Sequence, residues 1–81
     1  MNNRGLAYYN KGEYSRAIAD YDEALKLNPQ YVDAFIYRGL AYEQISDKVK
    51  AIESYRQALA VAQNPQVKEF AQQKLKELAG N

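Results

Sequence analysis

The chain repeats a pattern of residues with a period of 34 positions. The pentapeptide Arg-Gly-Leu-Ala-Tyr occurs at residues 4–8 and again at 38–42, and an Ala-Ile pair follows each copy at the same distance. The same shift superimposes Tyr21 on Tyr55. A constant period of this length is typical of stacked supersecondary units, each of which buries its apolar face against the next. Because the matching residues are mostly small or apolar, the property that repeats is packing.

Each unit contains an internal turn that divides it into two helices. The first turn is expected at residues 11–13, where Gly12 tolerates a positive φ angle. The second is expected at Ser46-Asp47, where either side chain can cap the helix that follows. Each unit is therefore predicted to be a helix–turn–helix.

Two Asn-Pro pairs, at 28–29 and 64–65, mark the ends of the units. Each is interpreted as an N-cap residue followed by Pro at the first helical position, where Pro loses no hydrogen bond. The second pair comes two residues later than the period requires. The sequence predicts five helices, over residues 2–11, 14–27, 30–45, 48–63 and about 66–79.

The predicted fold class is all-α, a solenoid of helix–turn–helix repeats that forms a single domain. Repeat 1 is placed at residues 1–30, repeat 2 at 31–63 and a C-terminal capping helix at 64–81. The capping helix has an apolar stripe that would shield repeat 2 from water, formed by Val67, Phe70, Ala71, Leu75 and Leu78. The alanines of the second helices are expected to be buried at close helix contacts, namely Ala17, Ala24, Ala51 and Ala58.

The two helices of each pair differ in their apolar patterns. The second helix has one apolar stripe, as expected for a helix packed on one face. The first helix is apolar nearly all round, and in residues 31–45 only four side chains are strongly polar: Asp33, Arg38, Glu43 and Gln44. The first helices are therefore either sandwiched between neighbours or carry a second interface.

These residues resemble the tetratricopeptide repeat (TPR) family, in which 34-residue helical pairs carry Gly and Tyr on the first helix and Ala, an aromatic residue and Ala on the second. The matching residues are Gly5, Tyr8, Ala17, Tyr21, Ala24 and Pro29, which recur as Gly39, Tyr42, Ala51, Tyr55, Ala58 and, displaced, Pro65. Phe35 stands where the family prefers Trp. The resemblance implies a right-handed superhelix whose first helices line a concave groove that binds peptides or partner helices.

Helical spacing selects the residues that would face such a groove. They share one side of the first helices and mostly escape the 34-residue repetition: Asn3, Leu6, Tyr9, Asn10, Asp33, Ile36, Tyr37, Leu40 and Gln44. Asn3 and Asn10 are candidates for binding a peptide backbone, because an amide side chain both donates and accepts. The alternatives are that the apolar members cover seams between helices and that the two Asn are solvated.

Some TPR domains clamp a C-terminal carboxylate with Lys, Arg and Asn. Here Asp33 and Tyr37 stand where the cations would be needed, so we expect no such clamp.

Composition argues against several other functions. The chain has no His and no Cys, and no nucleophile is paired with a base, so no enzyme, metal site or cofactor is expected. A net charge of +1 argues against a nucleic-acid partner and a polybasic membrane anchor. No apolar run approaches the ~20 residues that span a bilayer, and no signal peptide is recognisable, so a cytoplasmic location is expected.

The sequence therefore predicts a protein-interaction adaptor that binds a protein or peptide segment in its groove. The alternative is an engineered or truncated repeat protein, made for folding or assembly and without a natural ligand; the chain starts inside the first repeat, with Met1 at an aromatic position. Two extra residues before Asn64 rotate the last helix by about 200° unless the connection folds back. A homodimer, formed by end stacking or by exchange of the last helix, is a further prediction.

Overall fold

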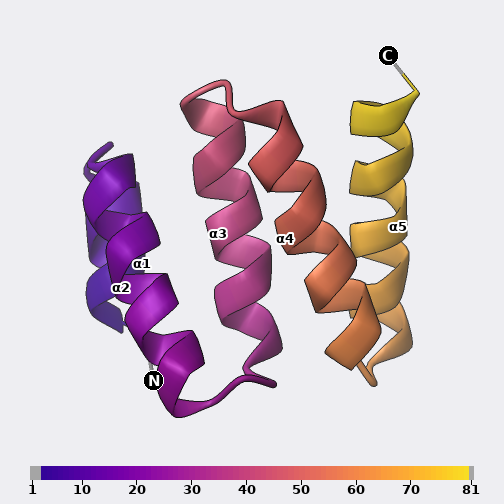
Figure 1. Ribbon diagram of the computed structural model, residues 1–81, viewed down its shortest axis with the longest axis horizontal. Coiled ribbons are helices and arrows are strands. Elements are labelled where there is room, and N and C mark those ends of the chain that lie inside the picture. Colours follow the sequence, from indigo (N-terminus) through magenta and orange to yellow (C-terminus); the bar gives the residue numbers. More distant parts are fainter. Residues whose placement is uncertain (1–2, 81) are drawn as a thin grey trace.

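The computed structural model describes residues 3–80, except the side chain of Asn3. Within this part the chain forms five helices and no strand: α1 (Asn3–Asn10), α2 (Tyr14–Leu27), α3 (Val32–Gln44), α4 (Lys48–Val61) and α5 (Pro65–Ala79). Each helix packs against the next in the sequence, and α3, α4 and α5 stand side by side in Figure 1. The predicted all-α helical-repeat class is confirmed. The predicted helix ends that the structure describes differ by at most two residues.

The turns inside the two helical pairs are copies of each other. Gly12 has a φ angle of 82°, and Ser46, 34 residues later, has a φ angle of 63°. In both turns the following residue donates its backbone N–H back to the first helix: Glu13 to Tyr8 O and Asp47 to Tyr42 O, each at 2.9 Å. Repetition of the sequence thus extends to the hydrogen bonds of the turn, even where Ser replaces Gly.

Side-chain caps begin two of the helices. The Asp47 carboxylate accepts the N–H of Lys50 at 3.2 Å at the start of α4, so Asp47 and not Ser46 is the cap. The Asn64 side chain accepts the N–H of Gln66 at 2.8 Å, with Pro65 in the first turn of α5. The predicted Asn-Pro boundary at 64–65 is confirmed.

The same interpretation of Asn28-Pro29 is wrong. Asn28 lies at the C-terminal end of α2, and α3 begins only at Val32, with Tyr31 as its N-cap. The Asn28 side chain accepts the N–H of Gln30 at 3.2 Å, and its backbone carbonyl accepts the N–H of Tyr31 at 3.1 Å. Asn28 therefore closes a local turn over the end of α2, a role for which Asn is well suited, instead of starting α3.

The core lies between the helices of each pair. Ala17, Ala51 and Ala58 are fully buried, as expected from their place at close helix contacts. The prediction for Ala24 is wrong, because this residue is only half-buried. Ala24 lines a surface hollow of about 260 Å³ near the end of α2, together with Leu27, Asn28 and Tyr31. No side chain fills this hollow in residues 3–80.

The closest approach between α3 and α4 depends on Gly39. A Cβ atom at this position would lie 2.8 Å from two carbon atoms of the Tyr55 ring. The absent side chain thus lets the fully buried Tyr55 pack directly on the backbone of α3.

Arg38 fastens α3 to both neighbouring helices on its side away from α5. Its Nε donates to the Ser54 hydroxyl of α4 at 3.0 Å, and its Nη1 donates to Asp22 of α2 at 2.8 Å. The Arg38 side chain is only 16% exposed, and its guanidinium lies 5.3 Å from the centre of the Phe35 ring. The charged head of Arg38 is therefore held in place by α2 and α4.

The last helix folds back onto its own chain. The connection between α4 and α5 comprises only residues 62–64, and α5 packs against α4. Ala71 is fully buried in this contact, and Val67 and Leu75 are half-buried. Phe70 remains 41% exposed, so it stands at the edge of the predicted apolar stripe.

Candidate functional site

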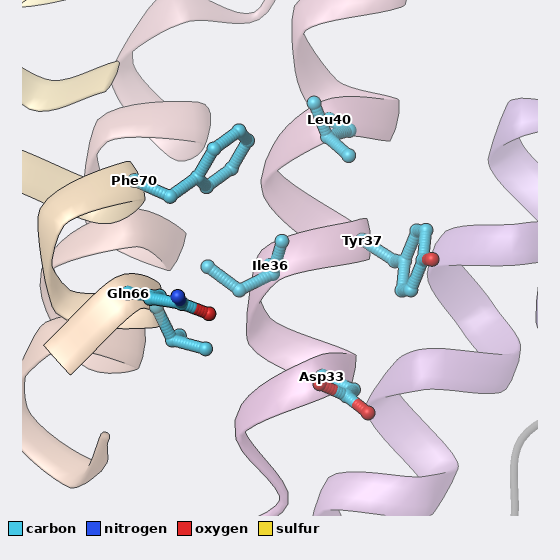
Figure 2. Close-up of a pocket in the computed structure, with 7 residues that line it drawn as sticks. Asp33, Ile36, Tyr37, Leu40, Gln66 and Phe70 are labelled. Carbon is cyan, nitrogen blue, oxygen red and sulfur yellow. The ribbon is translucent and has the colours of Figure 1, made fainter. Parts of the chain in front are cut away.

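An open hollow lies between α3 and α5. It has a volume of about 330 Å³ and is called the α3–α5 groove here. Its lining residues come from both helices: Asp33, Ile36, Tyr37 and Leu40 from α3, and Gln66, Val67 and Phe70 from α5. Figure 2 shows Ile36 and Phe70 pointing toward each other across the groove.

Helical periodicity places the α3 residues on one stripe. Asp33, Ile36, Tyr37 and Leu40 are spaced by three or four residues, so their side chains share one face of the helix. The other face of α3 carries the buried residues Ala34, Phe35, Gly39 and Ala41. Ile36, Tyr37 and Leu40 are therefore left half-buried, while Asp33, in the first turn, is exposed.

Tyr37 connects the groove to a cluster of tyrosines that reaches α1 and α2. Figure 2 shows its ring leaving the opposite edge of α3, away from Phe70. The Tyr37 ring stacks on Tyr21 of α2, with centroids 6.1 Å apart, and meets the edge of Tyr9 of α1 at 6.3 Å. Tyr9 in turn meets Tyr14 at 5.4 Å. These contacts fix the Tyr37 ring, so this wall of the groove is preorganised.

The α5 wall is fixed by Phe70 and by an ion pair next to it. The edge of the Phe70 ring meets Tyr55 at a centroid distance of 6.4 Å, and the Lys74 ammonium lies 5.9 Å from the Phe70 centroid. Lys74 forms an ion pair with Glu43 of α3 at 3.4 Å, and the Tyr55 hydroxyl donates to the same Glu43 carboxylate. Burial, and then this hydrogen bond, raise the pKa of Tyr55 above its ordinary value. The polar contacts therefore tie α3, α4 and α5 together beside the groove.

The structure brings together only part of the predicted groove. Asp33, Ile36, Tyr37 and Leu40 line the α3–α5 groove, whereas Gln44 is exposed and does not. On α1, Leu6 and Tyr9 are half-buried and Asn10 is exposed, and none of these three lines this groove. The side chain of Asn3 lies outside the described residues.

Sequence reasoning missed the α5 contribution of Gln66, Val67 and Phe70. The sequence places Val67 and Phe70 in the apolar stripe of the capping helix, which was predicted to shield repeat 2 from water. Consecutive residues of an α-helix are about 100° apart, so Phe70 could not face α4 as directly as the buried Ala71. This angular offset between Phe70 and Ala71 could have indicated from the sequence that the Phe70 side chain is directed toward α3.

Among residues 3–80, no helix combines the length and the apolar character that crossing a membrane requires.

Comparison with known families identifies the repeat. A sequence profile described as "Tetratricopeptide repeat" matches residues 2–68 of the chain. The chain belongs to the tetratricopeptide repeat family, which confirms the resemblance inferred from Gly39, Tyr55 and their counterparts. Membership of this family indicates a helical scaffold for protein–protein interaction.

Several curated relatives carry one name, "Photosystem I assembly protein Ycf3". The protein from Prochlorococcus marinus (strain NATL2A) is 38% identical over 65 residues, which are 76% of this chain and 36% of the relative. Those from Parasynechococcus marenigrum (strain WH8102) and Synechococcus sp. (strain CC9605) are 38% and 36% identical over 58 residues, or 68% of this chain and 34% of each relative. The chain thus spans about a third of the length of the relatives it matches. The printed name describes these relatives as assembly proteins.

Proposed function

We propose that this chain is a non-catalytic adaptor module that binds a peptide or helical segment of a partner protein in the α3–α5 groove. The observation that carries the proposal is a set of apolar side chains left open on two facing helices: Ile36, Leu40, Val67 and Phe70. Few apolar surfaces of this kind are left contiguous and concave without a binding role. The proposed module is the single domain of two repeats and a capping helix described above.

The wider groove proposed from the sequence extends the site along α1. Tyr9 touches Tyr37, so a segment that leaves the α3–α5 groove beside Tyr37 would next meet Tyr9, Leu6 and Asn10. Such a surface suits an extended peptide or a helix that crosses both repeats. A protein partner, with neither nucleic acid nor membrane involved, agrees with the balanced charge of the chain, and a cytoplasmic location stays a prediction.

Peptide display tests this proposal. A random peptide library is selected against the wild-type protein, and the enriched peptides are titrated against Phe70→Ala and Val49→Ala. Phe70 lines the groove, whereas Val49 is an apolar residue of α4 that is 77% exposed outside it. Loss of the Phe70 ring is expected to weaken binding by about tenfold, as for a central apolar contact, and Val49→Ala is expected to leave it unchanged.

Two outcomes would contradict the proposal. Equal weakening by both variants would place the binding surface elsewhere. A folded protein that unfolds cooperatively at high temperature but enriches no saturable ligand would favour the alternative, a repeat protein without a natural partner.

We also propose that two copies associate by stacking of their ends. Leu27 is 89% exposed beside the unfilled hollow at Ala24 and Tyr31, which leaves apolar surface at the α2 end of the stack. Exchange of α5 is the weaker version, since α5 already packs against α4 of its own chain. Light scattering at about 10 and 500 μM is expected to show a rising mean mass, because association follows mass action. A constant monomer mass would exclude the stacked dimer.

A further inference from the structure

Among the residues that line the α3–α5 groove, one side chain is charged at neutral pH, the carboxylate of Asp33. Asp33 is exposed in the first turn of α3, and it forms no ion pair with another residue in the range 3–80. Figure 2 shows its carboxylate at one end of the groove, beyond Ile36 and Tyr37. A ligand whose apolar side chains fill the groove would therefore pass next to an uncompensated negative charge.

A second hollow continues along α5 and adds further carboxylates. It shares Gln66 and Phe70 with the groove, and its remaining lining residues are Glu69, Gln73, Lys74 and Glu77. Glu69 and Glu77 are exposed. Lys74 is the one cation that lines either hollow among the described residues, and it already pairs with Glu43 at 3.4 Å.

The negative character is local to this surface, since the whole chain has a net charge of +1. Two of its arginines are neutralised elsewhere, Arg4 by Asp20 and Arg38 by Asp22. Among the residues that line the two hollows, the acids Asp33, Glu69 and Glu77 outnumber the one cation, Lys74. Acids and bases are nearly balanced in the whole chain.

We propose that the groove selects a protein segment in which apolar side chains are flanked by Lys or Arg. This inference rests on the proposed function and names the chemistry of the partner. Apolar side chains occupy the space between Ile36 and Phe70, one cation lies beside Asp33, and a second faces Glu69 on the α5 side. Charge complementarity at the rim of an interface raises the association rate and rejects partners of the wrong sign. An acidic segment meets only carboxylates and the paired Lys74.

Three peptides of equal length test the selection. All carry fluorescein, an amidated C-terminus and the same Leu-Phe-Leu centre, and they differ in two flanking residues, which are both Lys, both Gln or both Glu. Fluorescence anisotropy measures their affinities for the wild-type protein. The Lys peptide is expected to bind about tenfold more tightly than the Glu peptide at low salt. The difference should shrink in about 1 M salt, where the screening length falls to ~3 Å.

Asp33→Lys and Glu53→Lys form the matched pair of variants. Glu53 is an exposed acid of α4 that lines neither hollow. Because both substitutions replace an acid with Lys, they change the net charge of the protein equally. Asp33→Lys is expected to reduce the Lys-to-Glu preference by about fivefold or more, the effect of losing an exposed ion pair and gaining a repulsion. Glu53→Lys is expected to preserve the preference.

The results separate this inference from the proposed function. Binding of all three peptides with equal affinity would overturn the charge selection and leave groove binding intact. An equal loss of preference in both variants would assign it to net charge and not to Asp33, which also overturns the inference. Failure of every peptide to bind contradicts the inference too, and the display experiment with Phe70→Ala then decides the proposed function independently.

Discussion

Tyr21 and Tyr55 occupy equivalent positions in the two helical pairs, yet their hydroxyl groups have different surroundings. Both residues are at most 1% exposed. The Tyr55 hydroxyl donates to Glu43, whereas the Tyr21 hydroxyl is buried without a hydrogen-bond partner. The 34-residue shift explains the difference, because the position of Glu43 is occupied by Tyr9 in the first pair. The repeat therefore conserves the volume of the aromatic ring but not the partner of its polar end.

The equivalent arginines of the two pairs also differ in their hydrogen-bond partners. Arg4 donates through Nε and Nη2 to Asp20 at 2.9 and 3.0 Å, and Arg38 donates to Ser54, which stands 34 residues after Asp20. Only Arg38 also reaches the preceding pair, through Asp22. The Arg4 side chain is 75% exposed and that of Arg38 is 16% exposed.

The second helical pair thus has more of the compared polar groups hydrogen-bonded than the first, and it is more tightly packed at one alanine position. Ala58 is fully buried, while its counterpart Ala24 borders an unfilled hollow. Equal residues at equivalent positions should therefore contribute unequally to stability. In a repeat protein such differences matter, since stability is approximately a sum of terms for individual repeats and their interfaces.

The largest difference is expected for enlargement of the two alanines. Ala58→Leu must force a larger side chain into a fully packed contact and is expected to lower the free energy of unfolding by about 3 kcal/mol. Ala24→Leu should cost less than about 1 kcal/mol, because the hollow of the α2 end accepts the added atoms. Urea denaturation of both variants measures the two losses. Equal losses would show that the hollow is closed in solution.

A smaller difference is expected for removal of the two arginines. Arg38→Ala leaves the hydroxyl of Ser54, which is 1% exposed, without its partner and uncovers Phe35; we expect a loss of about 2 kcal/mol. Arg4→Ala removes an exposed ion pair, and its effect should be small and should fade in added salt. Denaturation at low and high salt separates the two cases. A loss for Arg38→Ala that also vanished in salt would indicate that its head is solvated.

The repeat made most of this fold predictable. The 34-residue period, the Asn64 cap and the Gly12 turn are local properties of the sequence, and each was confirmed. Asn28 was misassigned because an Asn-Pro pair suits both a helix start and a turn that closes a helix end. Ala24 was misassigned because its burial depends on what covers it, and the repeat pattern does not contain that information.

The candidate site was less accessible from the sequence for a related reason. Asp33, Ile36, Tyr37 and Leu40 follow from the periodicity of one helix. The opposite wall depends on how α5 is oriented after a connection that breaks the period. Tertiary contacts fix this orientation, namely the burial of Ala71, the contact of the Phe70 ring with Tyr55 and the ion pair of Lys74 with Glu43.

The smallest and most selective difference is expected for removal of the two tyrosine hydroxyls. Tyr55→Phe deletes the donor to Glu43 and leaves that half-buried carboxylate with Lys74 alone, so we expect a loss of about 1–2 kcal/mol. Tyr21→Phe deletes a hydroxyl that is buried and unpartnered, which removes its desolvation cost; stability should stay unchanged or rise by up to about 1 kcal/mol. Calorimetric melting of both variants shows directly whether each substitution lowers or raises stability.

If the two Tyr→Phe substitutions change stability in opposite directions, the two pairs share the packing of the aromatic ring and differ in the hydrogen bonding of its hydroxyl group. A clear loss for Tyr21→Phe would mean that its hydroxyl has a partner in solution, such as a buried water molecule. In that case both tyrosine hydroxyls would be hydrogen-bonded, and the two pairs would still differ at Ala24 and Arg4. Because the Tyr21 ring also stacks on Tyr37, the same variant titrated with a groove ligand tests whether the hydroxyl affects binding. We expect unchanged affinity, since Phe preserves the ring that positions Tyr37.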